Sequence, residues 1–134
     1  MGVDQVPGTV AAMMAADAAS RALGIELVSC RAGHAVCRMT VREDMTNGYD
    51  IAHGGLVFTV ADTAFACACN SHGGTTVAAG ADIVFVAPAR RGDVLTAEAV
   101  ERTVFGRSGI YDVTVRRGDG ELIAEFRGRS RTLR

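Results

Sequence analysis

The chain of 134 residues contains no lysine and has no excess of charge of either sign. Its 14 basic residues are all arginine and are nearly matched by 15 acidic residues, which gives a formal net charge of -1 at pH 7. Without excess positive charge, a protein lacks the electrostatic field that draws it to nucleic acids or to anionic membranes. We therefore expect neither a nucleic-acid partner nor a membrane partner.

Long apolar runs are also missing. The most apolar segment, 54–69, is interrupted by Asp62 and is shorter than the roughly 20 residues that a bilayer span requires. Residues 1–5 lack the basic region that begins a secretory signal, so we expect a cytoplasmic location. A chain of this length buries about two thirds of its unfolded surface, enough for one core, and residues 1–134 are expected to form a single domain.

The four cysteines do not suggest a disulfide framework. In a cytoplasmic chain, thiols such as Cys30 and Cys37 are typically small buried hydrophobic residues. Cys67 and Cys69 are two apart in a helical pattern, which directs them to different faces. His34 and Cys37 have the spacing of metal ligands, but no second pair completes a tetrahedral site. The sequence predicts no metal ion.

Hydrophobic periodicity predicts helices and strands that are segregated along the chain. A first helix is expected from Thr9, a candidate N-cap, to Gly24, followed by strands over 25–30 and 37–42. The alanine-rich run from His53 to Asn70 predicts one long buried helix. Four more strands, separated by short turns that contain glycine, are expected over 76–87, 94–105, 110–117 and 121–132. This order indicates an α+β fold with an antiparallel sheet packed on one long helix.

Asp62 is the only charged residue between His53 and His72, in the middle of the helix that is otherwise apolar. A carboxylate in such a place is costly unless it is paired or used. It could simply point to solvent, but its neighbours at helical spacing include Phe58 and Phe65, which do not form a polar face. Burial beside these rings is expected to raise the pKa of Asp62.

Gly54 and Gly55 stand at the expected start of this helix. The first N–H groups of a helix have no intrahelical acceptor, so a glycine start can form an oxyanion hole, although Gly-Gly also occurs there for steric reasons. At 1.5 Å per residue, the helix separates Gly54 from Asp62 by about 12 Å, too far for both to reach one carbonyl group. If both act in one site, they belong to two chains related by a twofold axis.

The pattern of these residues resembles the hotdog-fold acyl-CoA thioesterases, and within them the phenylacetic acid degradation branch. The resemblance covers roughly residues 40–131. The residues that carry it are Asn47, His53-Gly54-Gly55, Asp62-Thr63, Asn70-Ser71, Gly73 and Phe126-Arg127-Gly128.

This resemblance implies a curved antiparallel sheet wrapped around the long helix. It also implies a homodimer that forms the active site, with two dimers joined as a homotetramer. The implied reaction is hydrolysis of phenylacetyl-CoA, or a hydroxylated phenylacetyl-CoA, to the free acid and coenzyme A. No cofactor is implied, because coenzyme A is part of the substrate. A medium-chain acyl group remains an alternative.

By the same resemblance, Asp62 matches the catalytic carboxylate, and Gly54 matches the residue whose backbone N–H polarises the thioester carbonyl. Asn47 and His53 match polar residues that hold the carbonyl or the attacking water, and Thr63 matches a hydroxyl beside the carboxylate. From the residues alone, His53 could equally bond nearby backbone, and Asn47 could be a turn residue.

Coenzyme A carries phosphates, so arginines are expected at the mouth of the site. The hairpin residues Arg107 and Ser108 match a nucleotide-contacting segment of related thioesterases, and Arg91 is a further candidate. Arginines of the last strand, over 127–131, are candidates too, but each could instead lie on a solvated face of the sheet.

A carboxylate and an oxyanion hole suffice for thioester hydrolysis, with Asp62 as general base or as nucleophile. The sequence leaves both routes open. Two other functions compete with this one. A hotdog dehydratase needs a histidine where Asn47 stands, and an amide cannot shuttle the proton. A non-catalytic protein that binds acyl-CoA would use Asp62 only as a buried hydrogen-bonding residue.

Overall fold

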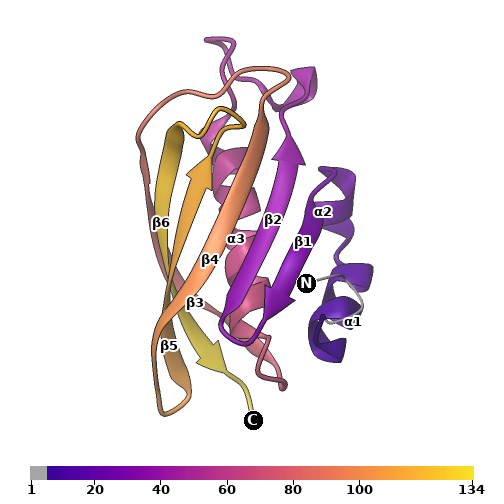
Figure 1. Ribbon diagram of the computed structural model, residues 1–134, viewed down its shortest axis with the longest axis vertical. Coiled ribbons are helices and arrows are strands. Elements are labelled where there is room, and N and C mark those ends of the chain that lie inside the picture. Colours follow the sequence, from indigo (N-terminus) through magenta and orange to yellow (C-terminus); the bar gives the residue numbers. More distant parts are fainter. Residues whose placement is uncertain (1–5) are drawn as a thin grey trace.

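The computed structural model describes residues 6–134, which form three α-helices and one six-stranded antiparallel sheet (Figure 1). The helices are α1 (Gly8–Ala16), α2 (Ala18–Ala22) and α3 (Gly54–Cys69), with a 3-10 turn, η2 (Glu43–Met45). The strands are β1 (Glu26–Arg31), β2 (His34–Thr40), β3 (Thr76–Phe85), β4 (Val94–Phe105), β5 (Ser108–Arg116) and β6 (Leu122–Thr132). Their order across the sheet is β1-β2-β4-β5-β6-β3.

The sheet curves around α3, and α1 and α2 lie beside the β1 edge (Figure 1). The alternating side chains of β5 explain this arrangement: Tyr111, Val113 and Val115 are buried toward α3, whereas the residues between them face outward. This architecture confirms the predicted α+β hotdog fold with an antiparallel sheet around one long central helix.

The predicted long helix is confirmed as α3, and both of its ends are fixed by side chains. His53 caps the first turn, where its Nδ1 accepts a hydrogen bond from the Gly55 N–H at 3.1 Å. After the last turn, the Asn70 side chain donates to the Thr76 carbonyl and accepts from the Thr76 N–H, each at 2.9 Å. Asn70 therefore joins the end of α3 to the start of β3.

The predicted first helix is two helices, because Asp17 interrupts it. The Asp17 carboxylate accepts hydrogen bonds from the Ser20 N–H at 3.0 Å and the Ser20 hydroxyl at 2.6 Å, which makes Asp17 the N-cap of α2. Thr9 is not an N-cap. It lies inside α1, which follows Pro7, and its hydroxyl donates to the Asn70 carbonyl at 3.1 Å.

β3 is an edge strand that pairs only with β6 among the described elements. Large apolar side chains are exposed where it ends, with Val84 62%, Phe85 53% and Val86 53% accessible.

The four cysteines are free and buried. In the described part of the chain, no helix combines the length and apolar character that a bilayer crossing requires.

We predict that Gly128→Ala destabilises the fold, because β6 passes very close to α3 at this position. A Cβ on residue 128 would lie 2.7 Å from Cζ of the buried Phe65. Overpacking of this kind typically costs about 1–3 kcal/mol in the free energy of unfolding, which urea titration would measure. Gly118→Ala is the control, since nothing lies within 4 Å of its Cβ position. Equal stability of the two variants would contradict the prediction.

Candidate active site

The start of α3 presents one backbone donor that no described residue satisfies. His53 Nδ1 accepts from the Gly55 N–H, and the His53 carbonyl accepts from the N–H groups of Leu56 and Val57 at 2.9 and 3.2 Å. The Gly54 N–H has no acceptor among residues 6–134. The first turn therefore offers a single hydrogen bond, at the positive end of the helix dipole.

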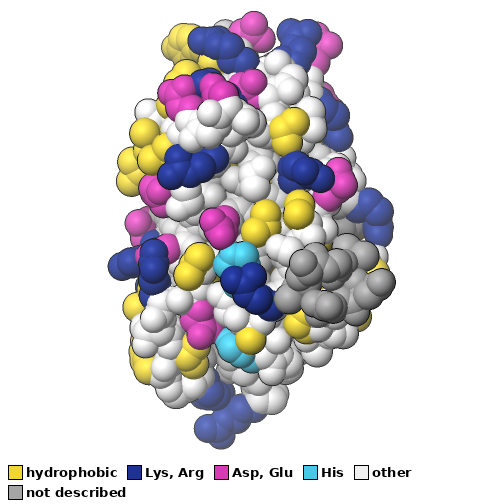
Figure 2. Space-filling model, viewed as in Figure 1, with side chains coloured by type: hydrophobic (Ala, Val, Ile, Leu, Met, Phe, Trp, Pro, Cys, Tyr) yellow, Lys and Arg dark blue, Asp and Glu magenta, His cyan; other side chains and the backbone are white. Residues whose placement is uncertain are grey.

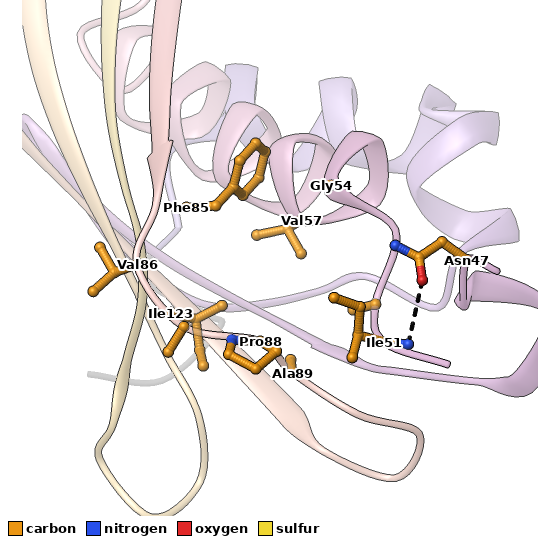
Figure 3. Close-up of a pocket in the computed structure, with 11 residues that line it drawn as sticks. Asn47, Ile51, Gly54, Val57, Phe85, Val86, Pro88, Ala89 and Ile123 are labelled. Carbon is orange, nitrogen blue, oxygen red and sulfur yellow. Dashed lines mark hydrogen bonds between the residues drawn. The ribbon is translucent and has the colours of Figure 1, made fainter. Parts of the chain in front are cut away.

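A side chain at position 54 would be crowded by a neighbouring ring. A Cβ at this position would lie 3.0 Å from Cζ of Phe85, whose ring covers the helix start. Gly54 and Phe85 line a pocket of about 440 Å³ between α3, the end of β3 and the start of β6 (Figure 3). Its other lining residues are Asn47, Ile51, Ala52, Val57, Val86, Ala87, Pro88, Ala89 and Ile123.

Asn47 is a turn residue whose amide nitrogen is left for the pocket. Its Oδ1 accepts hydrogen bonds from the N–H groups of Tyr49 at 2.9 Å and Ile51 at 3.4 Å. These bonds fix the amide so that its nitrogen lies on the side of Gly54 (Figure 3). Asn47 and Gly54 thus provide two donors to one largely apolar pocket.

His53 is exposed, and its ring bonds the backbone of its own helix. Because Nδ1 accepts the Gly55 N–H, the ring proton of a neutral His53 lies on Nε2. His53 thus makes the backbone hydrogen bond that was one of its two expected roles, whereas its catalytic role stays a prediction. Its cap leaves the Gly54 N–H as the one donor at the helix start without an acceptor among residues 6–134.

Asp62 lies two turns further along α3 and does not line this pocket. Its side chain is half-buried, and no hydrogen bond or ion pair reaches it from residues 6–134. Burial raises the pKa of Asp62 above the ordinary value, and the nearby Asp17 carboxylate adds to the increase. Helix α3 keeps Asp62 about 12 Å from Gly54, so these two candidate groups lie apart within one chain.

Thr63 is buried, and its hydroxyl points to α2. It lies 2.9 Å from the hydroxyl of Ser20, which in turn donates to Asp17. Sequence reasoning missed Asp17, although Asp is among the residues preferred at a helix N-cap. It also missed Phe85, for which an apolar strand end gave no distinctive signal.

The three predicted coenzyme A contacts lie at two different ends of α3. Arg91 is on the side of Gly54, with its guanidinium 3.8 Å from Glu43 Oε1 and 3.7 Å from Asp50 Oδ1. Arg107 and Ser108 form the β4–β5 hairpin, and Ser108 lines a second pocket of about 310 Å³ together with Cys69 at the opposite end of the helix.

Arginines of the last strand are mostly paired with carboxylates. Arg127 and Arg102 both bond Asp112, at 2.6 and 2.7 Å, and Arg129 bonds Asp82 at 3.1 Å. Arginine and acidic side chains are interspersed on the face shown in Figure 2. These pairs favour a solvated sheet face over phosphate binding for Arg127 and Arg129.

Within the described residues, no group of three or more His, Cys, Asp or Glu is placed to hold a metal ion.

Comparison with known proteins gives a consistent result. The sequence model of the thioesterase superfamily matches residues 49–124. The acyl-coenzyme A thioesterase PaaI of Escherichia coli is 43% identical over 122 residues, which cover 91% of this chain and 87% of that protein. The human acyl-coenzyme A thioesterase 13 is 33% identical over 123 residues, covering 88% of this chain and 87% of that protein.

The fold is similar to solved structures as well. The structure of E. coli PaaI, a protein from the phenylacetic acid degradation operon, superposes with a TM-score of 0.92 at 42% identity. The superposition covers 94% of this chain and 91% of that one. The predicted relationship to the phenylacetic acid branch is thereby confirmed. This chain belongs to the thioesterase superfamily and is a thioesterase of the hotdog fold.

Proposed function

We propose that the protein hydrolyses acyl-CoA thioesters in sites built from two subunits. The observation that carries this proposal is the separation of the candidate groups along α3. The Gly54 N–H, which has no acceptor among residues 6–134, lies beside the Asn47 amide in one pocket, and Asp62 lies about 12 Å away. The relatives are named acyl-coenzyme A thioesterases, which supports the reaction class. Asp62 of one subunit would act with Gly54 of its partner.

The open face of one chain supports such a dimer. In the part of the chain that the structure describes, no strand pairs with the outer edge of β3, and Val84 and Phe85 are exposed beside the pocket. Antiparallel pairing of two β3 edges would set two α3 helices side by side in opposite directions and create two equal sites. Further association into a tetramer and a cytoplasmic location remain predictions.

In each site, the Gly54 N–H would hold the thioester oxygen, and the Asn47 amide would assist it. As general base, Asp62 takes a proton from the water that attacks the carbonyl carbon. As nucleophile, Asp62 attacks directly, and water then cleaves the mixed anhydride. In both routes the negative oxygen of the tetrahedral intermediate accepts the Gly54 hydrogen bond, and the thiolate of coenzyme A leaves. His53 supports the donor by occupying the next N–H.

The substrate would enter with its acyl group in the apolar part of the pocket, against Ile51, Val57 and Ile123. A phenylacetyl or hydroxylated phenylacetyl group is proposed, because the similar E. coli protein belongs to a phenylacetic acid degradation operon. Arg91 would meet the coenzyme A phosphates from one subunit. In an antiparallel dimer, Arg107 and Ser108 of the other subunit lie at the same end and would meet the nucleotide.

We predict that Asp62→Asn retains the dimer and the affinity for coenzyme A but loses about 100- to 10,000-fold in turnover, because it lacks both a base and a nucleophile. Thiol release from phenylacetyl-, hydroxyphenylacetyl-, benzoyl- and hexanoyl-CoA would measure this and select the acyl group.

Binding without turnover by the wild-type protein would favour the non-catalytic function. Hydration of an enoyl-CoA, the reverse of dehydration, would favour the dehydratase. Chelation of metal ions is expected to leave turnover unchanged.

The raised pKa of Asp62 also predicts how pH affects stability. A carboxyl with a raised pKa in the folded state binds its proton more tightly there, so stability falls as pH rises from about 4, the ordinary Asp value, through the folded pKa. The Asp62→Asn variant does not lose stability in this way, because its amide does not titrate. Relative to wild type, its free energy of unfolding in urea should therefore increase between pH 4 and pH 7.5. A difference in stability between the variant and wild type that does not change between pH 4 and pH 7.5 in favour of the variant would contradict the prediction.

A further inference from the structure

A chain of hydrogen bonds connects α2 to the turn of α3 that carries Asp62. The Asp17 carboxylate accepts from the Ser20 hydroxyl at 2.6 Å, and the Ser20 and Thr63 hydroxyl oxygens are 2.9 Å apart. Ser20 is 2% exposed and Thr63 is 6% exposed. Buried polar groups of this kind are costly to leave unpaired, so the chain holds its three members in place.

The charge of Asp17 sets the direction of this chain. An ionised carboxylate can only accept, so the Ser20 hydroxyl donates to Asp17 and its oxygen accepts the Thr63 proton. The Thr63 hydroxyl consequently donates its proton to Ser20 of α2, and its oxygen can only accept further hydrogen bonds. The Thr63 proton is therefore not available to Asp62, which keeps its carboxylate free of an intramolecular donor.

Asp17 is also the acidic group that acts on Asp62 from the neighbouring helix. Within α3, the Cys69 thiol is influenced by Asp62. The titratable groups of the strands packed on α3 act on other residues than Asp62. Cys30 and Cys37 lie beside Cys67, and Tyr111 and Glu101 act near Cys69. No basic group of residues 6–134 forms an ion pair with Asp62 to offset the negative charge of Asp17.

We propose that Asp17 is a positioning residue for Asp62. Through the buried hydroxyls of Ser20 and Thr63 it ties α2 to the turn of α3 that bears Asp62, and it holds a second carboxylate beside that residue. The hydrogen bonds hold the turn of α3 that bears Asp62 against α2, and the negative charge of Asp17 favours proton uptake by Asp62. This role rests on the proposed function of Asp62 in hydrolysis.

The test is Asp17→Asn, which removes the charge but keeps the N-cap, because the Asn oxygen can still accept from the Ser20 N–H. The acidic limb of the profile of kcat against pH should move to lower pH, since a like charge near Asp62 is lost. At the plateau, kcat should fall by roughly two- to tenfold with KM unchanged, because a weaker base remains in place. A pH titration of the Asp62 carboxyl carbon by NMR should move in the same direction without substrate.

Asp119→Asn is the matched control, because Asp119 also accepts a backbone N–H, from Glu121 at 3.1 Å, on a turn away from α3. Its profile should equal that of wild type. Ser20→Ala keeps the charge and the cap of Asp17 but breaks the tie, so kcat should fall without a shift of the limb. If Asp17→Asn does not fold, Asp17→Ser provides the same test with a capping hydroxyl.

The outcomes separate the two proposals. Wild-type protein that does not hydrolyse thioesters, or active Asp62→Asn, overturns the proposed function. If Asp62→Asn is inactive while the folded Asp17 variant keeps the wild-type limb and NMR titration, the role of Asp17 is overturned, even if its stability is lower. Wild-type kcat in Ser20→Ala overturns the tie between α2 and α3.

Discussion

The stiffness of one helix is the constraint on which the rest of the site depends. α3 fixes Gly54 and Asp62 about 12 Å apart, and no side-chain rotation can close this gap. The curved sheet buries one side of α3 to form the core, whereas Asp62 is only half-buried. The element that stabilises the fold therefore also keeps the two candidate catalytic groups of one chain apart.

At the start of α3, backbone and amide groups replace charged residues. The donors at the pocket are the Gly54 N–H and the Asn47 amide, and both are set by local turns: His53 caps Gly55, and Tyr49 and Ile51 hold the Asn47 oxygen. Preorganised neutral donors of this kind stabilise a developing negative charge without the desolvation that a buried cation would require.

The sequence predicted the elements with a strong period and the residues with an unusual setting. Helix α3 and the strands of the sheet followed from apolar patterns, and Asp62 was recognisable as a charge in an apolar helix. The break at Asp17 was not predicted, because alanine-rich sequence on both sides favours helix and the competing bonds to Ser20 are local.

Predictions about partners across the fold were less successful. Thr63 was identified from the family resemblance as a hydroxyl beside the carboxylate, but its hydroxyl bonds Ser20, 43 positions away. Phe85 covers Gly54 only because β3 ends beside the start of α3. Such contacts depend on the tertiary path of the chain, which hydrophobic periodicity does not describe.

The negative charge of Asp17 near Asp62 has a consequence for the end of the reaction. Hydrolysis converts a neutral thioester into an anionic acid, and this anion would form near Asp62, which has no ion-pair partner among residues 6–134. Like charges at short range repel strongly where water is excluded. A site arranged in this way would hold its substrate better than its product, so the released acid would be a weak inhibitor.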